Sequence, residues 1–583
     1  MASTFLTPVT LWKDFDESLP LEEETLSERT EEGTIFRDVC FYGREVGKER
    51  VKIYAQYVLP AGEERFPAVM ILFEAGCPFD EAFIRRFTSR GYGVLCVDYC
   101  GDNGTLLHTV YPESIDYANY VRAGSHLDRA EPTAKETSWY EWAGVARYAA
   151  KFLSTRAEIT RFGAIGLRTG GEVLFKIAPY SRLSCMISVC AAGWLAYRGM
   201  EKFAEGEKKV FDEEHHRFIA GIDSQSYAPY VKCPVLLLSA VNDKKHDYDR
   251  VYDTFQQLDP AIEKAFLYSS HGNGLIGMHS LADIDLFLDK YLKERSVFVS
   301  EPISLSVEED ENGNLVARAE FDKEGELREY GIFYTERITG SHARDWTRVL
   351  GVPSNLNGNI GTFPLDLYEK SDRALVYAFA NYSNNFSVTS KIQEVIVKKQ
   401  YKNVCVKSRI IYSSERDALN GISGFRRRAR SIADCFADGK GVDAKLLPGY
   451  GGILGATAEA GVVSYRVNEP RYSAPEGASL RFDAYCAEDA TIKVTFYFDE
   501  DVFRAGASGR VSFLMQESLS LQQAYISKTL QMRFLSCLSA VNKCSSITSY
   551  GSDNASSPYH CGDQKTAPVR RQTMGDRAHG RGL

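Results

Sequence analysis

The sequence lacks several features that would assign it to a broad class of protein. No stretch reaches the roughly 18 apolar residues of a membrane-spanning helix, and residues 1–20 contain no apolar run of signal-peptide length. Basic charge is not in excess, because the net charge is −9 and the sequence pI is near 5.8. These absences predict a cytoplasmic protein that binds neither nucleic acid nor membranes.

The cysteines show no pattern typical of disulfides or metal sites. There are 13 of them, an odd number, without CxxC spacing or paired histidine ligands. Cys96, Cys185, Cys190 and Cys233 lie inside apolar runs, which is typical of small buried side chains. The acids and histidines of 212–216 follow two lysines on a predicted helix, so we interpret them as a solvated face. We therefore expect no metal and no cofactor.

What the sequence does contain is an α/β pattern. A chain of 583 residues exceeds the roughly 250 to 300 residues of a single core, so we expect several domains. Over 35–293, short apolar runs alternate with longer helical segments, as in parallel strands joined by crossover helices. Several runs are continuously apolar, as strands covered on both faces must be. The expected strands are 51–58, 68–73, 93–97, 162–167, 185–189, 235–239 and 265–268, and the helix 281–292 closes the unit.

After residue 293 the sequence changes to a strict alternation of apolar and polar residues. Residues 303–307 alternate, and Asn312-Gly313 turns the chain into a second alternating run. The spacing predicts an immunoglobulin-like β-sandwich over 298–398. A second, jelly-roll-like sandwich is predicted over 400–505, where stacking of sugars is a candidate function. The aromatic candidates for that stacking are Tyr465, Tyr472 and Tyr485.

The two ends of the chain carry less pattern. Residues 1–34 are expected to form an N-terminal extension. In 506–583 the periodicity fails and serine is abundant, so we interpret this segment as a disordered or non-native tail.

One strand-to-helix junction carries the chemistry. An apolar strand ending near residue 167 turns sharply into a helix through Gly166, Gly170 and Gly171, which permit a strained turn and close helix–strand approach. This junction resembles the nucleophile elbow of the α/β-hydrolase superfamily. The nearest resemblance, covering about half of the chain, is to the dienelactone hydrolase and acyl-thioesterase-like branch. It rests on Gly166-Leu-Arg-Thr-Gly-Gly-Glu172 and Cys233-Pro-Val-Leu-Leu-Leu.

The resemblance implies a fold and a set of site residues. The fold is an α/β-hydrolase domain, a mainly parallel sheet with flanking helices, followed by two smaller all-β domains. The superfamily's chain order of nucleophile, acid and histidine aligns Asp243 with the acid and His279 with the base, and His271 is the alternative base. Arg168 stands where the superfamily has serine, cysteine or aspartate.

The same resemblance indicates where an oxyanion and a ligand would lie. Backbone N–H groups of Gly76, Cys77 and Thr169 are the candidates for stabilising an oxyanion. Trp194 and Trp142 are the candidates for lining a pocket at the carboxyl edge of the sheet.

Arg168 separates four accounts of function. A guanidinium stays protonated and offers no lone pair, so it cannot attack a carbonyl. In the first account the domain has lost the serine mechanism and binds a small acyl or anionic ligand. In the second it is an ester or thioester hydrolase that uses Thr169, Cys77 or histidine-activated water. In the third Arg168 orients an anionic substrate for a lyase or isomerase step, and in the fourth the domain is structural.

Overall fold

The structure, a computed structural model, describes most of the first 400 residues and shorter segments beyond them. The described residues are 5–62, 64–203, 210–241, 243, 246–269, 279–336, 338, 341, 344, 346–368, 371–399, 410–419, 422–424, 444–458, 461–464, 479–485, 490–498, 515–521, 525–531 and 544–550.

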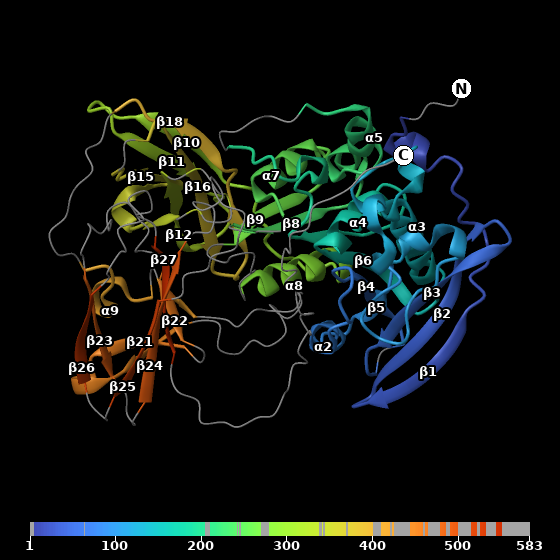
Figure 1. The fold of residues 1–583 in the computed structure, drawn as a ribbon, viewed down its shortest axis with the longest axis horizontal. Coiled ribbons are helices and arrows are strands. Elements are labelled where there is room, and N and C mark those ends of the chain that lie inside the picture. The colour runs from blue at the N-terminus through green and yellow to red at the C-terminus, as the bar shows by residue number, and fades with distance from the viewer. Residues whose placement is uncertain are drawn as a thin grey trace, which may run out of the picture.

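A mixed sheet forms the centre of the N-terminal half (Figure 1). Its strand order is β1-β2-β3-β5-β4-β6-β7-β8-β9. The strands from β5 through β9 pair in parallel, while β1, β2 and β3 join antiparallel at one side. The bounds are β1 Glu24–Glu31, β2 Thr34–Val46, β3 Glu49–Leu59, β4 Phe66–Leu72, β5 Gly93–Val97, β6 Ile159–Leu167, β7 Met186–Val189, β8 Val235–Ala240 and β9 Lys264–Ser269.

Helices cover both faces of this sheet, because its central strands are apolar on both sides. Apolar residues of α3, α4 and α7 share one buried cluster, and those of α2 and α8 share the other. The bounds are α1 Pro8–Leu11, α2 Glu81–Thr88, α3 Ser138–Ser154, α4 Thr169–Ile177, α5 Glu213–Gly221, α6 Ser224–Tyr227, α7 Tyr248–Gln257, α8 His279–Leu292 and α9 Ser414–Asp417. Among the described residues, none of these helices combines the length and apolarity needed to cross a bilayer.

The predicted fold class is confirmed: a mainly parallel sheet with flanking helices is followed by antiparallel β-sheets. The sheet nevertheless begins earlier than expected. Glu24–Glu31 lies within the segment predicted as an extension, yet it pairs with β2. Its residues are mostly charged or polar and nearly all exposed on the edge of the sheet, so they carry no alternation that would have revealed a strand.

The next unit consists of two antiparallel sheets that share buried apolar residues. One has the order β10-β11-β15-β14, and the other has the order β13-β12-β16-β17 with β18 paired to β16. This unit lies against the free side of β9, where the backbone N–H of Tyr268 donates to the hydroxyl of Thr389 at 2.9 Å. The bounds are β10 Ser304–Glu309, β11 Leu315–Glu320, β12 Leu327–Thr335, β13 Thr347–Leu350, β14 Leu356–Asn357, β15 Ile360–Pro364, β16 Arg373–Tyr382, β17 Ser387–Thr389 and β18 Gln393–Ile396.

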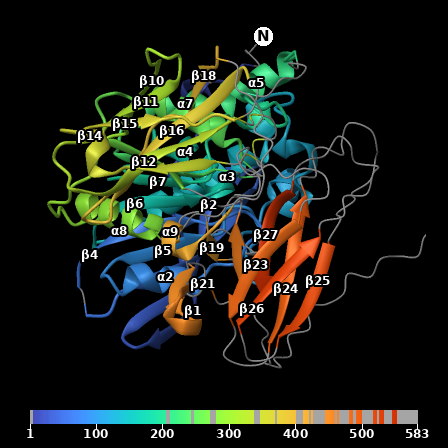
Figure 2. The same ribbon diagram turned by 90° about the vertical axis from the view of Figure 1, so that its left-hand side faces the viewer.

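Further strands form a group apart from the preceding unit, as both Figure 1 and Figure 2 show. Three of them fall in the segment for which no regular structure was expected, and each pairs with a strand from 462–498. The expectation is corrected for these positions, because pairing with distant strands is not visible in a serine-rich sequence. The bounds are β19 Ser423–Gly424, β20 Lys445–Pro448, β21 Leu454–Thr457, β22 Val462–Ser464, β23 Ser479–Tyr485, β24 Ala490–Phe498, β25 Met515–Leu521, β26 Tyr525–Gln531 and β27 Cys544–Tyr550.

Candidate functional site

Arg168 occupies the tip of a strained turn between β6 and α4. Its backbone has φ 50° and ψ −113°, a conformation that non-glycine residues rarely adopt. The neighbouring glycines are needed for close approach. A Cβ on Gly170 would lie 2.1 Å from the Leu72 carbonyl oxygen, and one on Gly166 would lie 2.5 Å from the Gly170 carbonyl oxygen. The local geometry is therefore that of an elbow that projects residue 168 at the carboxyl edge of the sheet.

The Arg168 guanidinium forms an ion pair with Asp243. Nη1 lies 2.9 Å from Oδ2 and 3.2 Å from Oδ1 of Asp243, whose side chain is 1% exposed. Glu74, which follows β4, lies 3.7 Å from Nε of the same guanidinium. Burial opposes the charge of Arg168, but Cys190, Asp243 and Glu74 together raise its pKa above the ordinary value. The structure thus brings together two of the predicted site residues, as an ion pair at the elbow tip.

Two of the three backbone donors predicted for an oxyanion, those of Gly76 and Cys77, are engaged elsewhere, while the N–H of Thr169 stays a prediction. The N–H of Gly76 donates to the carbonyl of Asp102 at 3.2 Å, and the N–H of Cys77 donates to the carbonyl of Glu74 at 3.1 Å. This is a correction for Gly76 and Cys77. Their positions in the loop after β4 were predicted, but the turn in that loop uses their hydrogens.

Thr169 fastens the elbow to the same loop. Its hydroxyl oxygen accepts from the N–H of Ala75 at 2.6 Å and lies 2.8 Å from the hydroxyl of Tyr99. Because Tyr99 donates its own proton to the carbonyl of Phe73 at 2.6 Å, Thr169 is the donor of their shared bond. The hydroxyl therefore has a structural role, which removes the reason for treating Thr169 as a substitute nucleophile.

The structure does not describe the side chains of the two predicted bases. His271 lies outside the described residues. His279 is the first residue of α8, and its side chain is outside the description as well. Their assignment as bases stays a prediction.

The two predicted pocket tryptophans differ in position. Trp142 is fully buried, and its indole N–H donates to the carbonyl of Ala118 at 2.6 Å. It belongs to the core beneath α3, which corrects its assignment to a pocket. In the sequence, a large aromatic residue on a helix near the sheet edge has the same pattern whether it packs in the core or lines a pocket. Trp194 is half-buried and donates to the hydroxyl of Thr254 at 2.9 Å, so its role as a pocket residue stays a prediction.

A strained loop after β7 borders the elbow. Three of its residues have positive φ: Cys190 at 51°, Ala192 at 66° and Trp194 at 60°. Glu172 of α4 holds this loop, because its buried carboxylate accepts from the N–H of Ala192 at 2.6 Å. It also accepts from the hydroxyl of Ser224. The sequence marked Glu172 as part of the elbow motif but gave no sign of this function.

The sequence also missed His246, which lies between β8 and α7. The pKa of this imidazole is lowered to about 4, mainly by burial. The charge of Arg168 also lowers the pKa, whereas Asp243 and Glu172 raise it. Its Nε2 is buried and has no hydrogen-bond partner among the residues that the structure describes. The only sequence signal was a histidine three residues after the predicted acid.

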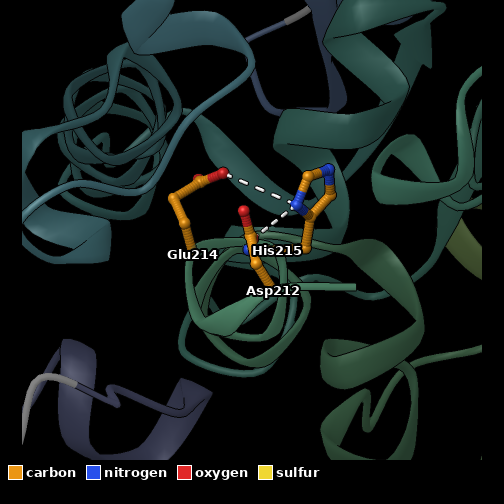
Figure 3. A group of neighbouring side chains, drawn as sticks. All are labelled: Asp212, Glu214 and His215. Carbon is orange, nitrogen blue, oxygen red and sulfur yellow. Dashed lines mark hydrogen bonds and ion pairs between the residues drawn. The ribbon is translucent and has the colours of Figure 1, made fainter. Parts of the chain in front are cut away.

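Among the described residues, one group of potential metal ligands lies at the N-terminal end of α5 (Figure 3). Ligand atoms of Asp212, Glu214 and His215 lie within 4.8 Å of one another. Local contacts already account for them. Asp212 caps the helix by accepting from the N–H of His215 at 2.9 Å and from its Nδ1 at 2.7 Å, and Glu214 accepts from the N–H of Ala130. A helix N-terminus favours such acids and disfavours a cation.

The side chains of the predicted sugar-stacking tyrosines lie outside the part of the chain that the structure describes. Tyr465 and Tyr472 lie outside the described residues, and Tyr485 ends β23 with its side chain outside the description.

Comparisons with known proteins were made with the sequence and with the structure. No protein-family model matches the chain, and no curated protein matches it. Among solved structures, an acetyl xylan esterase from Paenibacillus sp. R4 is 17% identical, with a TM-score of 0.38 over 49% of this chain and 92% of that one. Acetyl xylan esterase 1 from Thermoanaerobacterium sp. JW/SL YS485 is 16% identical, with a TM-score of 0.37 over 49% and 92%. An acylaminoacyl peptidase from Pyrococcus horikoshii is 15% identical, with a TM-score of 0.33 over 47% and 51%.

Proposed function

We propose that residues 24–292 form a hydrolase-fold domain that has lost the serine mechanism and binds a small acyl ligand at the elbow. The observation that carries this proposal is the pairing of Arg168 with Asp243. The residue at the tip is a guanidinium, which has no nucleophilic atom. The carboxylate that the resemblance aligns with the catalytic acid is paired with that guanidinium.

The surroundings of the tip support the same proposal. Rate enhancement in acyl transfer depends on preorganised donors aimed at the developing oxyanion, and each missing donor costs roughly 100- to 1,000-fold. The N–H groups of Ala75, Gly76 and Cys77 all donate to groups of the protein itself. Asp243 and Glu74 already place two carboxylates beside the single guanidinium of Arg168, so an uncharged acyl ligand fits better than an anion.

The test is labelling by a fluorophosphonate probe. We expect no adduct at position 168 in the wild-type chain. Arg168→Ser should become labelled, and Arg168→Ala, which also removes the guanidinium, is the matched control that should not. Hydrolysis of short acyl esters by Arg168→Ser should stay weak, because the nearby N–H groups are already engaged. A folded Arg168→Ser that takes no label would contradict the elbow assignment.

The alternative is an active ester or thioester hydrolase that uses Cys77 or histidine-activated water. It predicts that the wild-type chain hydrolyses short acyl esters or thioesters. It further predicts that His279→Ala abolishes this activity while Arg168→Ala does not. That pair of results would replace the proposal above.

A further inference from the structure

The imidazole of His246 is placed among the charged groups of the elbow without forming a bond to them. The groups that act electrostatically on it are Arg168 at the elbow tip, Glu172 on α4 and Asp243 after β8. On its other side Gly193 packs against the ring. A Cβ at Gly193 would come within 2.9 Å of Nδ1 and Cε1 of the imidazole. The ring is thus held between the elbow and the loop that follows β7.

The unpaired Nε2 of His246 needs a physical explanation. Folded proteins give almost every buried polar atom a hydrogen-bond partner, since an unmade bond costs the desolvation of that atom. Nε2 has none among the described residues. The loop against the ring carries backbone strain at Cys190, Ala192 and Trp194, and strain of this kind concentrates at ligand sites. Two independent features therefore mark the same place.

We propose that His246 contacts the ligand of the elbow site, using Nε2 to form one hydrogen bond with an uncharged carbonyl, amide or hydroxyl group. This inference rests on the proposed function, because it specifies the ligand of that same site. A ligand group at Nε2 supplies the partner that none of the described residues supplies.

The ligand group is uncharged because the imidazole is neutral near pH 7. Burial keeps its pKa far below the ordinary value, so the ring offers a hydrogen bond and no charge. The adjacent cation is occupied as well, since both oxygens of Asp243 lie within 3.2 Å of Nη1 of Arg168. Because Asp243 and Glu74 already place two carboxylates beside this one guanidinium, a carboxylate ligand would add to an excess of negative charge.

The experiment compares butyramide with butyrate, two ligands of similar size that differ in charge. Binding to the full chain and its variants is measured by isothermal titration calorimetry. NMR of histidines labelled with ¹³C at Cε1 reports contact at the ring, and His246→Asn assigns the signal of His246. We expect butyramide to shift this signal in a saturable way and butyrate to bind at least tenfold more weakly. In the absence of ligand, the signal should titrate with a midpoint well below 6.5.

Two variants separate contact from general damage. His246→Phe keeps a planar ring and removes Nε2, so it should weaken butyramide binding about tenfold, the value of one hydrogen bond. His216→Asn, on α5 outside the site, should leave binding unchanged. Absence of butyramide binding, binding that survives His246→Asn, or equal binding of butyrate would each overturn the inference. None of these results bears on fluorophosphonate labelling, which tests the proposed function separately.

Discussion

Removing the guanidinium of Arg168 should destabilise the protein, because it removes the cation paired with a buried carboxylate. The Asp243 side chain is 1% exposed and that of Arg168 is 13% exposed, with 2.9 Å between the charged groups. Breaking a buried pair from one side costs roughly 3–5 kcal/mol. Because Arg168 keeps some contact with solvent, we expect about 3 kcal/mol for Arg168→Met, which retains the apolar stem of the side chain.

Thermal unfolding of the full chain measures this cost. One kcal/mol corresponds to roughly 2–4 °C for a unit of 150–250 residues, so Arg168→Met should lower the first unfolding midpoint by about 6 °C or more. Asp243→Asn should also destabilise the protein. The double variant should lose less stability than the sum of the losses in the two single variants, because each single change already removes the shared interaction.

An exposed ion pair provides the matched control. Arg198 and Asp128 are also 2.8 Å apart, but their side chains are 62% and 64% exposed. Arg198→Met should therefore change stability by less than about 1 kcal/mol. The reasoning fails if Arg168→Met is no more destabilising than Arg198→Met, or if the effects at 168 and 243 simply add.

Two further predictions concern other buried charges. Arg344→Met should cost roughly 3–5 kcal/mol of stability, because the ion pair of Arg344 with Asp249 on α7 is 0% exposed on both sides. It should also expose the loop before β13 to proteolysis. Unchanged melting and protease resistance would contradict this prediction. The second prediction concerns the stability of the protein at low pH. The pKa of His246 is about 4 when folded against 6.5 as its ordinary value, so the unfolded chain takes up the proton first as the pH falls. Stability should decline between about pH 6.5 and 4, by up to about 1.4 kcal/mol per pH unit, and His246→Asn should decline less. Urea midpoints at pH 7 and 5 measure the difference, and equal declines would refute it.

The parts of the site that the sequence predicted are those defined by local pattern. Gly166 and Gly170 can be recognised because the turn and the close packing exclude a Cβ, and Asp243 because it follows the apolar run 235–238 of β8. A pattern of this kind also locates most strands of the parallel sheet. It fails for β1, whose exposed charges carry no periodicity.

The parts that the sequence did not predict depend on contacts between distant segments. The significance of His246 arises from Gly193 and Glu172, which are more than 50 residues away in the chain. The N–H groups of Gly76 and Cys77 were assigned correctly to a loop, but their hydrogen-bond partners follow from the exact turn. Trp142 shows the same limit, because burial separates a core aromatic from a pocket aromatic and composition does not.

The contact between β9 and the following β-unit has a practical consequence for making this protein. The N–H of Tyr268 on β9 is bound to Thr389, and its ring lies 5.6 Å from that of Tyr377. A fragment ending near residue 293 would present β9 as an open edge beside uncovered aromatic rings, which are the conditions that favour aggregation. Expression trials should therefore keep the chain through at least residue 399, so that the N-terminal α/β domain is produced together with its neighbour.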